Sequence, residues 1–178
     1  MSTGRDTELL AALALARAGD SGQAERLAEK LNREYPLDTT IQGYWLPTVH
    51  AALQLDRGNS QRAFEVLQRA SNYESSEPLP FQYFGVIYPA YVRGDAYLKM
   101  HQGPQAVGEF QKFLNNRGIV LNAPLAALAH LQLARAYSLT DDKSKSRAAY
   151  QDFFALWKDA DADIPILKEA KAEYAKLQ

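Results

Sequence analysis

The histidines are the side chains best suited to metal or acid–base chemistry in this chain of 178 residues, and they are isolated from one another. His50, His101 and His130 each lack a second ligand four positions further on, and the chain contains no cysteine. A zinc site needs several nitrogen or sulfur ligands that converge on one point. We therefore interpret the three histidines as solvated or capping residues and expect no metal.

Three aspartates near the C-terminus have the spacing that opens a calcium loop. They are Asp159, Asp161 and Asp163. Such a loop needs glycine at its sixth position and a bidentate glutamate at its twelfth, whereas Ile164 and Ala170 stand there. The segment is predicted to be a polar turn before a last helix, and we expect no cofactor.

The sequence offers little for catalysis. Arg93-Gly94-Asp95 spells an adhesion tripeptide, but Gly94 lies where two helices are expected to press together. No serine or threonine stands in a nucleophile-elbow motif, and no two carboxylates are spaced for acid and base roles in an expected pocket. Glycine-rich nucleotide loops and kinase catalytic motifs are also missing from the sequence. We expect the chain not to be an enzyme.

Composition excludes further classes of protein. The formal net charge is −1, from 20 basic and 21 acidic residues, so nothing steers the chain to nucleic acid or to an anionic membrane surface. No apolar run approaches the roughly 20 residues that span a bilayer. Residues 1–6 are polar and lack the apolar core of a signal peptide. With no cysteine, these features favour a cytoplasmic location.

The apolar pattern predicts helical hairpins throughout the chain. Apolar residues recur at helical spacing and are interrupted by glycine, proline and aspartate at turns. We expect one all-α domain over 1–178, with hairpins at about 7–35, 38–73, 86–116 and 124–158 and a capping helix at 164–177. Pro47 leaves two alternatives: the second hairpin's first helix begins near Leu46, or it is kinked at Pro47.

Aligning the hairpins on their turns brings small residues into register. In the second helices these are Ala24, Ala63, Ala106 and Ser146, and in the first helices Ala12, Ala51, Gly94 and Ala134. Four residues after the first set come Ala28, Leu67, Phe110 and Tyr150. A hairpin cannot bury its apolar stripe alone, so these units are expected to stack on one another.

This register resembles the tetratricopeptide repeat. Tyr97 and Tyr137 follow their small residues by three positions, and Pro36 ends the first unit. The units recur every 40 residues or so, longer than the roughly 34 of the family. The resemblance implies a right-handed superhelical solenoid that binds peptides along its concave face.

A narrower resemblance covers residues 36–178. The segments Tyr44–Pro47, Tyr91–Gly94, Arg117–Asn122, Ala134–Tyr137 and Trp157–Asp161 are similar to the C-terminal tetratricopeptide region of certain bacterial serine/threonine protein kinases and of related regulators. The resemblance implies a scaffolding or sensory region of a signalling protein, without the kinase itself.

The family's groove positions fall on one stripe in each first helix. The stripes comprise Trp45, Thr48, Ala52 and Leu55; Tyr88, Tyr91, Asp95 and Leu98; and Leu128, Leu131, Arg135 and Ser138. From these, the resemblance implies a peptide-binding groove of Trp45, Thr48, Tyr88, Tyr91, Asp95, Leu131 and Arg135. The alternative is that the aromatic residues pack on the loops between hairpins. The Lys and Asn pattern of a carboxylate-binding groove is not present, so no such clamp is expected.

Two functions remain open at this stage. The first is an interaction module that binds a protein or peptide in the groove, with no direct contact to nucleic acid or membrane. The second is a homodimerisation or spacer domain that uses a convex or terminal helix surface, for which an exposed Tyr174 would be evidence.

Overall fold

The protein is all-α throughout the part of the chain that the structure describes. The computed structural model describes residues 4–74, 87–116 and 124–177, and these ranges contain helices and turns without a strand. The expected fold class is confirmed at this level. None of the helices in these ranges is long and apolar enough to span a membrane.

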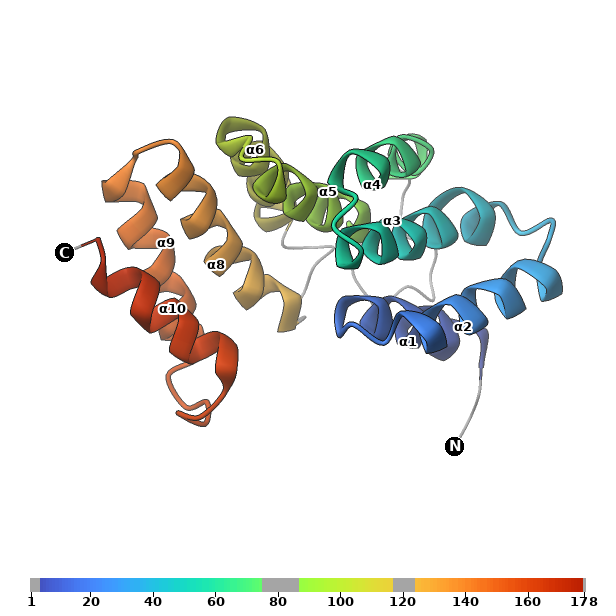
Figure 1. Cartoon of the computed structure of the whole chain (residues 1–178), viewed down its shortest axis with the longest axis horizontal. Coiled ribbons are helices and arrows are strands. Elements are labelled where there is room, and N and C mark those ends of the chain that lie inside the picture. Colours follow the sequence, from blue (N-terminus) through green and yellow to red (C-terminus); the bar gives the residue numbers. More distant parts are fainter. Residues whose placement is uncertain (1–3, 75–86, 117–123, 178) are drawn as a thin grey trace.

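The helices pack as successive antiparallel pairs, arranged in chain order from one end of the molecule to the other (Figure 1). The pairs are α1 with α2, α3 with α4, α5 with α6 and α8 with α9, and each also contacts the next. The last helix, α10, covers α9. The bounds are α1 Arg5–Arg17, α2 Ser21–Glu34, α3 Leu46–Asp56, α4 Ser60–Leu67, α5 Tyr88–Lys99, α6 Gly103–Asn115, α8 Pro124–Leu139, α9 Lys143–Leu156 and α10 Pro165–Ala175.

Pro47 lies where a π-helical turn joins α3, so the structure combines the two alternatives. A π-helical turn over Ile41–Trp45 leads directly into α3, which begins at Leu46 with Pro47 in its first turn. The helical backbone is continuous across this junction, since the amide of Leu46 donates to the carbonyl of Ile41 five residues earlier. The π turn accommodates Pro47, which has no amide hydrogen to donate. Asp38 accepts hydrogen bonds from the backbone amides of Thr40 and Ile41, both at 3.0 Å, and so caps the turn.

Each turn within a pair has a residue in the left-handed region, always five positions before the small residue of the second helix. These residues are Gly19, Gly58, His101 and Asp141, with φ of 84°, 78°, 56° and 57°. Glycine adopts this conformation without a Cβ penalty, so its use in the first two turns is expected. His101 therefore has a structural role as the left-handed residue of a tight turn. The register that the four pairs share includes this backbone conformation as well as the small side chains.

The small residues make the contacts within each pair, as the register predicted. Ala24, Ala63, Ala106 and Ser146 are all fully buried. The Ser146 hydroxyl donates to the carbonyl of Ala134 at 2.9 Å, which satisfies the one polar member of the set. A Cβ on Gly94 would lie only 2.6 Å from Cζ of Phe110, so the ring packs directly on the backbone of α5.

The capping helix α10 buries Leu167 and Ala170 against the rest of the domain. Tyr174 is half-buried, and its ring lies edge-on to Tyr150 and Phe154, with centroids 5.9 and 5.6 Å apart. The exposed Tyr174 that would favour a dimer surface is therefore not observed, because the tyrosine packs on α9.

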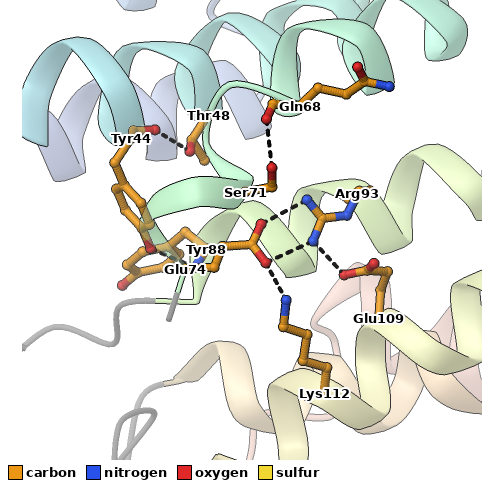
Figure 2. A network of polar contacts seen from close by, with 9 residues as sticks. All are labelled: Tyr44, Thr48, Gln68, Ser71, Glu74, Tyr88, Arg93, Glu109 and Lys112. Carbon is orange, nitrogen blue, oxygen red and sulfur yellow. Dashed lines mark hydrogen bonds and ion pairs between the residues drawn. The ribbon is translucent and has the colours of Figure 1, made fainter. Parts of the chain in front are cut away.

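A buried ionic network joins the second pair to the third (Figure 2). Glu74 follows the 3₁₀ turn Ser71–Tyr73, and its side chain is 1% exposed. It accepts two hydrogen bonds from Arg93 of α5, at 2.7 and 2.9 Å, and one from Lys112 of α6. Arg93 also donates to Glu109 of α6 at 2.8 Å. Burial alone raises the pKa of Glu74, but Arg93 and Lys112 outweigh burial and hold that pKa below its ordinary value.

The adhesion tripeptide is thus divided among three structural roles. Arg93 belongs to this network, Gly94 lies under the ring of Phe110, and Asp95 forms an ion pair with Arg17 of α1 at 2.8 Å. Successive residues of a helix point about 100° apart, which separates the three functions. The structural interpretation of the tripeptide holds.

Replacing Gly94 by alanine should destabilise the protein by about 2 kcal/mol, because the added methyl group overlaps the Phe110 ring. Urea denaturation measures the change. Gly108→Ala is the matched control, because Gly108 lies inside α6 with nothing within 4 Å of its Cβ position. Its replacement should stabilise the helix by up to about 1 kcal/mol. Equal stabilities for the two variants would contradict the packing of Phe110 on α5.

Replacing Glu74 by glutamine should cost about 3 kcal/mol at neutral pH, because Arg93 loses its most buried partner. The folded-state pKa of Glu74 lies below its ordinary value. Its carboxylate therefore stabilises the fold above about pH 4.3 and loses this effect as the pH falls. The difference in free energy of unfolding between wild type and Glu74→Gln should therefore become smaller at acid pH.

Urea denaturation between neutral and acid pH checks this, with Glu65→Gln as the control. The Arg62–Glu65 pair is exposed, and its loss should change stability by less than about 0.5 kcal/mol. If the difference in free energy of unfolding between wild type and Glu74→Gln stays constant with pH, the charge of Glu74 is not what stabilises the network.

Candidate functional site

A groove of about 470 Å³ lies where the first helices of all four pairs face one another. We call it the inner groove. Its lining comes from the C-terminal parts of α1, α3, α5 and α8. The apolar lining residues are Ala16, Ala52, Leu55, Leu98 and Leu139, and the charged ones are Arg17, Asp56, Asp95, Lys99 and Arg135.

A chain of polar contacts crosses the inner groove from α1 to α10, and we call it the polar strap. Arg17 donates to Asp95 at 2.8 Å, and the Gln132 amide donates to the other Asp95 oxygen at 2.9 Å. Arg135 donates to Gln132 at 3.1 Å and makes two hydrogen bonds to Glu173, each 2.9 Å long. The strap thus consists of Arg17, Asp95, Gln132, Arg135 and Glu173.

The ionisable groups of the strap are tuned by burial and by one another. Burial raises the pKa of Asp95 above its ordinary value, with the positive charge of Arg17 opposing the shift. Burial lowers the pKa of Arg17, but the carboxylate of Asp95 outweighs this effect, so the net shift is upward and the guanidinium stays charged. The Arg17 guanidinium also lies over the ring of Tyr91, 4.5 Å from its centroid, a cation–π contact.

Two of the seven candidate groove residues line the inner groove, namely Asp95 and Arg135. Both are committed to ion pairs of the polar strap, with Arg17 and with Glu173. Of the stripe positions beyond the seven, Ala52, Leu55 and Leu98 also line it.

The structure places Thr48, Tyr91 and Leu131 in the core, where they are 0%, 1% and 0% exposed. The Thr48 hydroxyl donates to the carbonyl of Tyr44 at 2.6 Å, one helical turn before it. Tyr91 packs edge-on against Phe110 and Phe113, with centroids 5.5 Å away in both cases. The expectation that they face an open groove is corrected for a geometrical reason: the three side chains lie on faces of the first helices that pack into the core. In α8, for example, the next residue, Gln132, lines the groove while Leu131 is buried.

Trp45 and Tyr88 pack on each other, away from the inner groove. Trp45 is 9% exposed and Tyr88 is half-buried, and their ring centroids lie 5.5 Å apart. The backbone amide of Tyr88 also donates to the Tyr44 hydroxyl at 3.1 Å (Figure 2). The aromatic residues therefore join the start of α3 to the start of α5. The segment 75–86, the long connection between these hairpins, lies outside the described residues.

Sequence reasoning missed one register position that lines the inner groove in every pair. Five residues after the small residue of each first helix come Arg17, Asp56, Lys99 and Leu139, and all four line the groove. The repeat register contained this signal. It was overlooked because the four side chains share no chemical character. Gln132 and His101 line the groove as well.

The described ranges contain no cluster of three or more histidine, cysteine, aspartate or glutamate side chains able to hold an ion.

Comparison with known proteins adds no name to this site. No protein-family model matches the chain, and no curated protein matches it.

Removing the link between Arg17 and Asp95 should uncouple the first pair from the third. A double-mutant cycle of Arg17→Ala and Asp95→Ala, measured by urea denaturation, should give a coupling energy of about 2 kcal/mol, because both side chains are largely shielded from water. The exposed pair Arg57 and Glu25 is the control and should couple by less than about 0.5 kcal/mol. Equal coupling energies in the two cycles would mean that the Arg17–Asp95 pair stabilises the protein no more than an exposed surface pair does.

Proposed function

We propose that this protein is an interaction module that binds a segment of a partner protein or peptide in the inner groove. The observation that carries the proposal is the convergence of four first helices on one groove, lined by the same register positions in successive pairs. Stacked helical pairs create extended surfaces of this kind, and such surfaces suit elongated ligands.

The lining supports a macromolecular ligand. Leu139 is 42% exposed and is one of the three large apolar side chains left open to water in the described ranges. The others, Leu37 and Leu156, are not part of the groove. An exposed leucine beside Leu55 and Leu98 offers a place for an apolar side chain of a partner, which is the type of contact that anchors many protein interfaces.

The repeat register and its resemblance to the tetratricopeptide family support a more specific proposal. In it the stacked pairs form a right-handed superhelix with the inner groove on its concave side. The similarity to the C-terminal regions of certain bacterial kinases supports the further proposal of a scaffolding or sensory role in signalling. The alternative is a homodimerisation or spacer domain that uses a convex or terminal helix surface. The exposed Tyr174 that would support it is not observed, because the ring packs against α9.

Selecting short random peptides on the intact chain tests the proposal. Peptides that bind should lose at least about tenfold in affinity on Leu139→Glu, because the glutamate places a charge among apolar lining residues. Fluorescence anisotropy measures the affinities. Leu156→Glu is the matched control, since Leu156 is 59% exposed on α9 and outside the groove. Equal effects of the two variants, or selection of no peptide, would exclude groove binding.

A further inference from the structure

The charges on the floor of the inner groove are already matched within the protein. Asp95 has Arg17 and Gln132 as partners, and Arg135 has Glu173 at 2.9 Å and Glu169 at 3.6 Å. These are the central members of the polar strap. A ligand that meets this floor therefore meets ion pairs whose members satisfy one another.

The two remaining charged lining residues also have polar partners inside the chain. The Lys99 ammonium donates to the carbonyl of Leu55 at 3.2 Å. Leu55 lies in the last turn of α3, where the helix carries a partial negative charge. Asp56 accepts a hydrogen bond from the Ser21 hydroxyl at 2.6 Å. Lys99 thus serves α3 as a capping cation.

Apart from His101 and Gln132, the rest of the lining is aliphatic. Ala16 and Ala52 lie beside Leu55, Leu98 and Leu139. The volume of about 470 Å³ falls within the ~300–1,000 Å³ typical of ligand pockets. The groove therefore suits a few side chains of an extended or helical segment, rather than the surface of a folded domain.

A charged ligand would incur a large penalty at this place. Its charge would lose water, while Arg17 and Asp95, and likewise Arg135 and Glu173, are already paired with each other. The exposed Lys99 and Asp56 carry opposite charges and add no net charge to the lining. An uncharged aliphatic segment loses little on desolvation and gains contact with the leucines. The electrostatics and the shape favour the same occupant.

We infer that the inner groove takes a short, uncharged aliphatic stretch of the partner, and that the polar strap excludes charged sequences by keeping the floor neutral. This inference rests on the proposed function and adds to it the chemistry of the partner. Arg17 and Asp95 are specificity-determining residues in this scheme, since each neutralises the other.

The test uses peptides selected on the intact chain and their variants with one central aliphatic residue changed to lysine or glutamate. The uncharged peptides should bind the wild-type protein best, and the affinity of both charged variants should be at least about tenfold lower. The affinity of the uncharged peptides should change less than about twofold between ~50 and ~500 mM salt. Fluorescence anisotropy gives the affinities.

Breaking the strap should change the charge preference in a defined direction. Arg17→Ala leaves Asp95 without its cation. The lysine peptide should therefore bind this variant with at least about fivefold higher affinity than it binds wild type. Asp95→Asn leaves Arg17 without its anion, so the glutamate peptide should gain instead. Arg57→Ala, which removes the same charge outside the groove, is the control for net charge and should leave the preference unchanged.

The outcomes separate this inference from the proposed function. Binding that is sensitive to Leu139→Glu but strongest for charged peptides, or unaltered in charge preference by both strap variants, overturns the inference and leaves the groove as a binding site. Binding that is insensitive to Leu139→Glu overturns both.

Discussion

The close approach of paired helices at small residues is the constraint on which the rest of this structure depends. Ala24, Ala63, Ala106 and Ser146 are fully buried, and Gly94 lies directly under Phe110. Any larger side chain at these positions would separate the two helices of a pair. Because the contact fixes how each first helix is rotated, it also determines which register positions face the next pair and which face the inner groove. The groove is thus a consequence of packing within the pairs.

Helix α5 is the joint between the two halves of the molecule. Val92 and Ala96 belong to the apolar cluster of the first two pairs, while Ala90 and Tyr91 belong to the cluster of the later ones. Its polar residues divide in the same way, with Arg93 bound to Glu74 and Glu109 and Asp95 bound to Arg17. Helix α5 therefore has three roles. It makes an ionic link to the pair before it, it packs closely on α6 within its own pair, and it contributes Asp95 to the inner groove.

The polar strap departs from the usual behaviour of stacked repeats, in which each unit contacts only its neighbours. Arg17 of the first pair reaches Asp95 and Tyr91 of the third. Such a contact couples units that are otherwise independent, and it lies across the surface proposed to bind a partner. The stability of the stack and the electrostatics of the groove are therefore set by the same residues.

The sequence by itself determined the helical class, the pairing and the small-residue register, because these follow from local periodicity and from turn chemistry at residues such as Gly19 and Gly58. It also placed Asp95 and Arg135 on the groove side. Only the tertiary structure decided that Thr48, Tyr91 and Leu131 are core residues, since their burial depends on how far the neighbouring pairs cover each first helix. The partnership of Arg17 with Asp95 and that of Glu74 with Arg93 were likewise invisible in the sequence. Each joins residues on different pairs, and no periodicity along one helix specifies what a second helix brings against it.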